Sequence, residues 1–337
     1  MRVFVCGCVH GSWDVVVDEV NKLVENGTKL DLIIVAGDLE AFITESDILS
    51  YKRPNGTQGL GSFHKIANGK KRLPCKMLVI GGNNESSDTI FQLPFGGWIT
   101  PDVYFTGRAS QIYFGDLLIT GISGVYKYKN YWKNVYEHFP IRNSESSKNS
   151  VNHTRAFSNF QVYGLKQLNI LVTHDWPSKI PTMFRDIIPK KSLVTSDRKN
   201  DFGMQDFLRI LNKHKPKYHF AAHHHIRFEC EPVPGTKFIA VPRVIQDNWY
   251  SLQTFDENPG DFMISGKWIN ILRKTEEYMK DPSSLKLINW DEEWTKINSI
   301  PSADLPVKVP VMEYNSDYKV QTAKFCETYG VYNPNII

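Results

Sequence analysis

The segment Arg2-Val-Phe-Val-Cys-Gly-Cys-Val-His10 is an apolar run that ends in a thiol and an imidazole, and it indicates the fold class most directly. Short β-branched or aromatic runs bounded by Gly, Asn, Asp or His predict buried strands. Further runs of this form occur at residues 31–36, 77–81, 169–173 and 218–222. We therefore expect a set of buried strands, each followed directly by polar residues.

The segment between the first two runs predicts a helix. Apolar residues recur there at helical spacing, and Gly27 is a suitable C-terminal stop. The resulting order of strand, helix and strand implies parallel pairing through a crossover. Open α/β sheets gather their sites at the carboxyl ends of the strands, so the polar residues that follow the runs are expected to converge.

These polar residues form five short motifs that together supply ligands for two adjacent metal ions. Asp38 is a single carboxylate that can bridge two cations about 3.5 to 4 Å apart. Strand alternation predicts His223 and His225 on one face and His224 on the other, so we assign the first two as ligands. Each motif alone has an ordinary structural explanation, but the whole series in this order predicts a dinuclear site. The motifs are Cys8-Val-His10, Gly37-Asp38, Gly82-Asn-Asn-Glu85, His174-Asp175 and His223-His-His225.

Composition indicates a globular protein of the reducing intracellular compartments. The 337 residues are 41% apolar and 12% aromatic, which suffices for a large core. Five cysteines, an odd number, do not suggest a secreted disulfide framework, and no run approaches the roughly 18 apolar residues of a membrane span. The opening residues are expected to form a first strand rather than a signal peptide. The net charge of +4 is too small to indicate a nucleic-acid partner by itself.

Residues 126–155 combine cations with aromatic rings. Cations can hold phosphates and rings can stack on bases, which favours contact with nucleic acid. The alternative is a solvated surface hairpin whose rings pack inward. The cations are Lys127, Lys129, Lys133, Arg142, Lys148 and Arg155, and the rings are Tyr126, Tyr128, Tyr131, Trp132, Tyr136 and Phe139.

The five motifs resemble those of the calcineurin-like phosphoesterases, whose series is Asp-x-His, Gly-Asp, Gly-Asn-His-Glu, His and His-x-His. Cys8 stands where the wider family has its first aspartate, and this Cys-x-His variant is a feature of eukaryotic RNA lariat debranching enzymes. Further similar stretches are Leu93-Pro-Phe-Gly-Gly97, Gly121-Ile-Ser-Gly-Val125, His174-Asp-Trp-Pro177 and Ala222-His-His-His-Ile-Arg-Phe228. The resemblance covers residues 1 to about 230.

This resemblance implies an α/β fold, the metallophosphoesterase α/β/β/α sandwich. The catalytic domain would span residues 1–230, with a lariat recognition loop inserted at about 126–155. Residues 231–337 would form a smaller C-terminal region packed on that domain.

The resemblance also implies two divalent metal ions. One would be held by His10, Asp38 and His225 with Cys8 at its side, and the other by Asp38, Asn83, His174 and His223. A thiolate shifts preference toward Fe²⁺ or Zn²⁺, with Mn²⁺ as a substitute. The alternative for Cys8 is a small buried hydrophobe that does not bind metal.

The implied reaction is hydrolysis of the 2'-5' phosphodiester at the branchpoint of intron lariat RNA by a metal-activated hydroxide, with Asp38, His10 and position 84 as catalytic residues. Asn84 replaces the family histidine that is credited with protonating the leaving oxygen. An amide cannot release a proton near pH 7, and general acid catalysis contributes about 10²- to 10⁴-fold. We therefore expect reduced turnover with RNA binding retained.

The resemblance further implies a nuclear protein whose partner is branched RNA, and we expect a monomer with no DNA or membrane partner. The candidate RNA-binding residues are Tyr126, Lys127, Lys129, Arg155 and Arg227. Core packing is the alternative for Tyr126, and structural ion pairs are the alternative for the two arginines. Two other functions remain in view, a catalytically weak branched-RNA-binding protein and another metallophosphoesterase such as a phosphatase. The basic aromatic insertion and Cys8 argue against the phosphatase.

Overall fold

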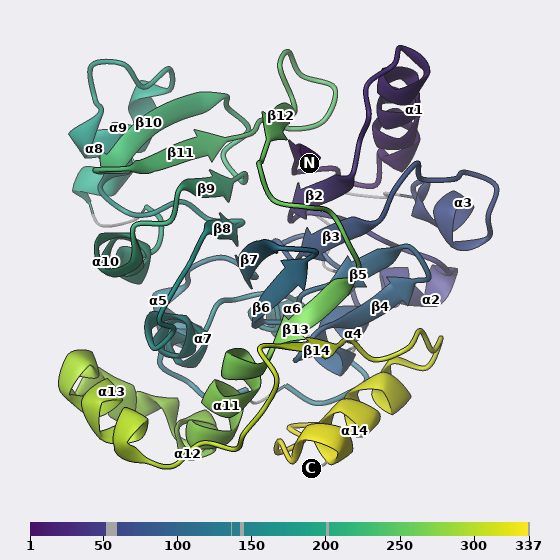
Figure 1. Ribbon diagram of the computed structural model, residues 1–337. Coiled ribbons are helices and arrows are strands. Elements are labelled where there is room, and N and C mark those ends of the chain that lie inside the picture. Colours follow the sequence, from purple (N-terminus) through teal and green to yellow (C-terminus); the bar gives the residue numbers. More distant parts are fainter. Residues whose placement is uncertain (52–58, 136, 142–144, 200–201, 336–337) are drawn as a thin grey trace.

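Two β-sheets face each other at the centre of the protein (Figure 1). The computed structural model describes residues 1–51, 59–135, 137–141, 145–199 and 202–335. The first sheet is parallel at its centre, with antiparallel strands at both edges. Its strands, in spatial order, are β12 (Ser251–Thr254), β1 (Arg2–Cys6), β2 (Leu32–Ala36), β3 (Met77–Ile80), β5 (Val103–Phe105) and β4 (Gly97–Thr100).

The second sheet is mixed and contains eight strands. Its parallel centre runs from β11 through β9 and β8 to β7. The strands, in spatial order, are β10 (Phe228–Val233), β11 (Thr236–Ala240), β9 (Tyr218–Ala221), β8 (Ile170–Thr173), β7 (Leu117–Ile122), β6 (Ala109–Phe114), β13 (Phe262–Ser265) and β14 (Lys308–Pro310).

Strand β1 shows how the sheets are held between apolar layers. Val3 and Val5 join the core between the two sheets, whereas Phe4 and Cys6 point to the outer layer with the helix that follows β1. Both faces are buried because side chains alternate along a strand and each face meets another layer. This explains why the strand reads as one continuous apolar run.

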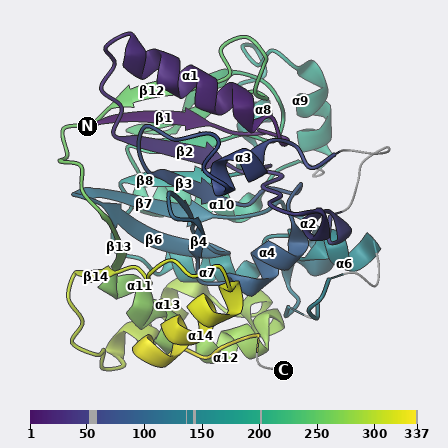
Figure 2. The same cartoon turned by 90° about the vertical axis from the view of Figure 1, so that its right-hand side faces the viewer.

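Helices cover the outer faces of both sheets, which confirms the expected α/β/β/α sandwich (Figures 1 and 2). Helices α1 (Trp13–Glu25) and α3 (Phe63–Ala67) lie on the first sheet, and α7 (Ala156–Tyr163) and α10 (Gln205–His214) on the second. Shorter helices fill the loops, namely α2 (Glu45–Leu49), α4 (Ser87–Gln92), α5 (Tyr128–Tyr131), α6 (Glu145–Ser150), α8 (Ile180–Met183) and α9 (Lys191–Arg198).

The chain after residue 230 contributes to both sheets through β11, β12, β13 and β14. Its helices gather at one end of the molecule (Figure 2). They are α11 (Gly266–Lys274), α12 (Glu276–Lys280), the 3-10 helix η1 (Pro282–Lys286), α13 (Trp290–Ser299) and α14 (Tyr318–Tyr329). The C-terminal region proposed from the sequence is therefore continuous with the sheets. Within the described part of the chain, no helix is both long and apolar enough to span a membrane.

Candidate dinuclear metal centre

The predicted ligand residues meet at the carboxyl ends of β1, β2, β3, β8 and β9. Most of them lie in tight turns directly after a strand, with backbone φ angles in the left-handed region. These angles are 50° at Cys8, 47° at His10, 54° at Asp38, 67° at His223 and 55° at His225. Non-glycine residues adopt such angles rarely, and they concentrate at functional sites.

The first cluster joins Cys8, His10, Asp38 and His225, whose ligand atoms all lie within 4.8 Å of one another. His10 Nδ1 lies 3.0 Å from Glu40 Oε1 and donates to this carboxylate. His10 Nε2 is then left with a lone pair, and it faces His225 Nε2 at 3.2 Å and Asp38 Oδ2 at 3.5 Å. A buried carboxylate behind a histidine is the usual way to orient a metal ligand.

The second cluster joins Asp38, His174 and His223. His174 Nδ1 donates to the Ala36 carbonyl oxygen at 2.6 Å, so its Nε2 lone pair faces Asp38 Oδ1 at 3.3 Å. Among the described residues, neither His174 Nε2 nor the buried Asn83 Oδ1 has a hydrogen-bond partner. Buried polar atoms are rarely left unpaired, so these acceptors fit a cation between them.

The electrostatics of Asp38 support the same interpretation. Burial alone would raise its pKa, but His174, His10 and His223 hold the pKa of this carboxyl well below its usual range. Burial opposes a charge on His174 as well, yet Asp38 raises the pKa of this imidazole. A carboxylate and a lone pair at this separation repel each other unless a proton or a metal ion lies between them. The donor set of carboxylate, imidazoles, amide oxygen and thiol fits divalent transition ions.

Cys8 lies in the first cluster with its Sγ toward the other ligands. It is fully buried, and it accepts a hydrogen bond from the His223 backbone N–H at 3.1 Å. Burial and then the Asp38 charge raise the pKa of the thiol well above its ordinary value. Because only a thiolate binds metal well, binding of an ion here would release the thiol proton.

Asn84 holds the shared carboxylate from two sides. Its backbone N–H donates to Asp38 Oδ1 at 2.8 Å and its side-chain Nδ2 donates to Asp38 Oδ2 at 2.9 Å. Tyr51 Oη lies 3.5 Å from the Asn84 Oδ1 atom. The amide therefore borders both ligand clusters through its contacts with Asp38.

Sequence reasoning did not assign roles to two buried carboxylates. Glu85 accepts from the backbone N–H groups of Leu39 at 3.0 Å and Gly82 at 2.6 Å, which ties two ligand-bearing loops together. Glu40 supports His10 as described above. Each residue follows a predicted metal ligand by two positions, Glu40 after Asp38 and Glu85 after Asn83, and an acidic residue at this spacing is the signal that could have identified them.

The strand alternation expected for the histidine triplet is wrong. Strand β9 ends at Ala221, and the three histidines lie in turns, where alternation between faces does not apply. His223 joins the second cluster and His225 the first, so both still reach the centre. His224 belongs to neither of these two clusters; it forms a third possible ligand group with Asp175 and His223, and its ring stacks on the Phe202 ring at 4.6 Å between ring centroids.

A groove of about 430 Å³ opens beside the second cluster. Tyr126 and Lys127 line it, as do Asn83 and Asn84, whereas Lys129 is exposed outside this lining. Tyr126 also packs edge-on against Tyr131, at 5.2 Å between ring centroids. The remaining lining residues are Val125, Tyr128, Asn149, His153, Asp175, Phe202, Gly203, His223 and His224.

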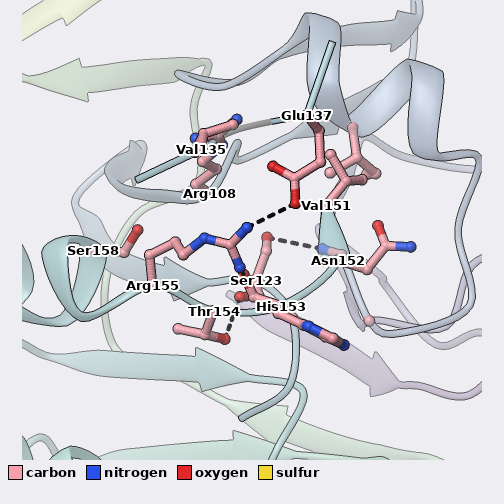
Figure 3. Close-up of a pocket in the computed structure, with 14 residues that line it drawn as sticks. Arg108, Ser123, Val135, Glu137, Val151, Asn152, His153, Thr154, Arg155 and Ser158 are labelled. Atoms are coloured by element: carbon pink, nitrogen blue, oxygen red, sulfur yellow. Dashed lines mark hydrogen bonds and ion pairs between the residues drawn. The ribbon is translucent and has the colours of Figure 1, made fainter. Parts of the chain in front are cut away.

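The two arginines expected to contact RNA are engaged within the protein. Arg155 is only 4% exposed, and its Nη2 donates to Glu137 Oε1 at 2.8 Å (Figure 3). Arg227 Nη1 donates to the Tyr250 carbonyl at 3.1 Å, and Arg227 also pairs with Glu229. These contacts favour the structural ion pairs considered above. Tyr136 and Arg142 lie outside the described residues.

Comparison with known proteins agrees with the geometry of the centre. Residues 1–227 match the family described as calcineurin-like phosphoesterase. A lariat debranching enzyme of Schizosaccharomyces pombe is 36% identical over 232 residues, which is 68% of this chain and 49% of that protein. The human lariat debranching enzyme is 30% identical over 299 residues, 82% of this chain and 54% of that protein. The Arabidopsis thaliana enzyme is 30% identical over 296 residues, 81% of this chain and 68% of that protein.

The first two of these relatives are much longer than this chain, which spans about half of their length. Its match to the family nevertheless covers both halves of the metal centre, from Cys8 to His225. The chain belongs to the calcineurin-like phosphoesterase family and, within it, to the lariat debranching enzymes.

Proposed function

We propose that this protein hydrolyses the 2'-5' phosphodiester at the branchpoint of lariat RNA. The observation that supports the proposal best is the juxtaposition of two ligand clusters with the groove lined by Tyr126 and Lys127. A phosphate at the clusters would have its neighbouring nucleotides in reach of a cation and aromatic rings. The names of the relatives point to the same substrate class.

Two divalent ions are the cofactors that we propose, and Fe²⁺ or Zn²⁺ suits a site with a thiol. Cys8, His10, Asp38 and His225 would hold one ion, and Asp38, Asn83, His174 and His223 the other. When bound, the ions supply Lewis-acid activation of water and neutralise charge on the phosphoryl oxygens. In this scheme Asp38 sets the spacing of the two ions and His10 is oriented by Glu40.

Asn84 limits the turnover in this proposal. Its amide donates to Asp38 and has no proton to release to the departing 2' oxygen. The residue can still hold a hydrogen-bonded phosphate oxygen beside the clusters. We therefore propose a debranching enzyme of reduced rate that keeps its affinity for branched RNA.

Cleavage of a synthetic 2'-5' branched RNA tests this proposal. The unsubstituted protein and Asn84→His would be compared with Fe²⁺, Zn²⁺ and Mn²⁺ supplied separately. We expect the histidine to raise the rate by about 10²- to 10⁴-fold. Asn212→His is the matched control, because Asn212 is exposed on α10 and does not line the groove, and it should leave the rate unchanged.

A second candidate, a branched-RNA-binding protein with little activity, is favoured by the same contact between Asn84 and Asp38. Tight binding of branched RNA without cleavage by either protein, with any of the three metals, would establish it. Rapid hydrolysis of a simple aryl phosphate without RNA cleavage would instead indicate a phosphatase. Nuclear location and a monomeric state are further proposals that the resemblance suggests.

A further inference from the structure

His153 occupies a fixed position in the wall of the groove, outside both metal clusters. Its backbone forms a β-bridge with Val125 and donates to the Ser150 carbonyl at 3.0 Å. Arg155 Nη1 donates to the His153 carbonyl oxygen at 3.2 Å. The backbone that carries this imidazole is therefore anchored on both sides.

A neighbouring amide sets which ring nitrogen carries the proton. Asn130 Nδ2 lies 2.7 Å from His153 Nδ1, and because an amide nitrogen can only donate, Nδ1 is the acceptor. Burial and then the charges of Arg155 and Lys127 lower the pKa of His153 to about 4. The ring is thus neutral at pH 7, with its single N–H at Nε2.

The ring lines the groove together with Asn83 and Asn84. It points away from the pair formed by Arg155 and Glu137 (Figure 3). Across the groove, Asp175 already accepts from the backbone N–H groups of Tyr126 at 3.0 Å and Trp176 at 2.9 Å. Among the described residues, no hydrogen bond from His153 Nε2 is found, and the residue lines the groove, where a ligand could accept from this donor.

We propose that His153 is a substrate-contacting residue whose Nε2–H donates to a non-bridging phosphate oxygen of the branched RNA, on a linkage next to the scissile one. This inference rests on the proposed function, because it places RNA in the groove. At the ring the charges of Arg155 and Lys127 outweigh the opposing charge of Glu137, which favours an anionic acceptor over a neutral base carbonyl or ring nitrogen.

The test measures binding rather than cleavage, so the slow turnover expected from Asn84 does not interfere. The affinity of a branched RNA and of its linear counterpart would be measured by fluorescence anisotropy for the full chain and for His153→Phe and His153→Gln. Phenylalanine keeps the ring without the donor, and glutamine keeps an uncharged N–H. We expect Phe to weaken binding of the branched RNA about tenfold or more, and Gln by less than about threefold.

His138→Phe is the matched control, since His138 is exposed in the same segment and does not line the groove. Thermal melting would show that all variants are folded. A set of branched RNAs, each with one linkage near the branch replaced by a neutral methylphosphonate, then identifies the contact. One such replacement should weaken binding to the unsubstituted protein about as much as His153→Phe does, and should add nothing in that variant.

The outcomes separate the two proposals. Equal affinity of His153→Phe and the unsubstituted protein for branched RNA would overturn the inference and leave the proposed function intact. The inference would also be overturned if every methylphosphonate weakened binding equally in the unsubstituted protein and in His153→Phe. In that case His153 would affect only the structure of the groove and would contact no single phosphate. Absence of any preference for branched over linear RNA in the unsubstituted protein would overturn both.

Discussion

The two ligand clusters share Asp38 but differ in the groups that surround it. The first contains the only thiol, and its His10 and His225 side chains are partly open to solvent. The second contains the fully buried His174, whose Nδ1 is fixed by a main-chain carbonyl. A soft thiol ligand influences which metal is selected, and access to solvent allows that metal to exchange. Burial of the ligands instead slows the loss of a bound ion. If two ions bind as proposed, we expect the first cluster to determine which metal is bound and the second to keep its ion longer.

The largest expected effect comes from substitution of Asp38, the ligand that the two clusters share. Asp38→Asn leaves both ions without the bridging charge, and we expect loss of both metals and of RNA cleavage below detection. Elemental analysis of the purified protein and the cleavage assay would measure this. Asp102→Asn is the control, since Asp102 lies at the surface in a pair with Lys76. Retention of one full metal equivalent in Asp38→Asn would contradict the shared role.

Single histidine substitutions should separate the clusters. We expect His225→Ala to lose the ion of the first cluster and His174→Ala that of the second, each leaving about one equivalent by the ligand sets proposed here. Metal content after dialysis would be compared for the two variants. If either substitution removed both ions, the clusters would not be independent and the comparison would fail.

Glu40→Gln should act on the first cluster alone. Gln keeps an acceptor for His10 Nδ1 but removes the charge behind it, so we expect metal affinity there to fall about tenfold. Competition with a chromophoric chelator would measure each affinity. Glu45→Gln in α2 is the control because this residue is exposed. An equal loss in the second cluster would show that Glu40 acts through Asp38 instead.

The smallest expected effect is a loss of folding stability at acid pH that arises from a buried histidine next to the second cluster. His219 is fully buried beside Thr173, the residue before His174, and burial lowers the pKa of His219 to about 3. The unfolded chain then binds more protons than the folded one below pH 6.5, so stability falls as pH falls, by up to about 1.4 kcal/mol per pH unit from this group. Denaturant unfolding between pH 6 and 4 would show a shallower dependence for His219→Phe. The same pH dependence of the unfolding free energy in both proteins would show that His219 does not cause this loss of stability.

The central strands could be predicted from sequence because their apolar runs are short, buried on both faces and bounded by turn residues. The run at residues 31–36 corresponds to β2 (Leu32–Ala36), and that at 77–81 to β3 (Met77–Ile80). The polar residues after them converge as expected, since parallel strands place their carboxyl ends together. The individual contacts at the site depend on packing between segments that are far apart in the sequence. The local pattern of apolar and polar residues does not predict these contacts.

Two examples show this limit. Strand alternation predicted His223 and His225 on one face, but these residues reach the two ligand clusters through left-handed backbone that the sequence pattern did not indicate. Arg155 was a candidate RNA contact with a structural ion pair as its alternative, but the sequence did not indicate that the partner would be Glu137, eighteen positions earlier in the chain. Neither contact follows from a local period of two or 3.6 residues.

The left-handed backbone of the ligand residues also has an energetic cost. Cys8, His10, Asp38, His223 and His225 each keep a backbone angle that glycine would adopt without strain. Each such residue costs on the order of 1 kcal/mol. Exchange of any of them for glycine would relieve this backbone strain but would also remove a ligand. The ligands are therefore held in a backbone conformation that their residue types disfavour, and the packing of the surrounding loops must supply the free energy that keeps them there.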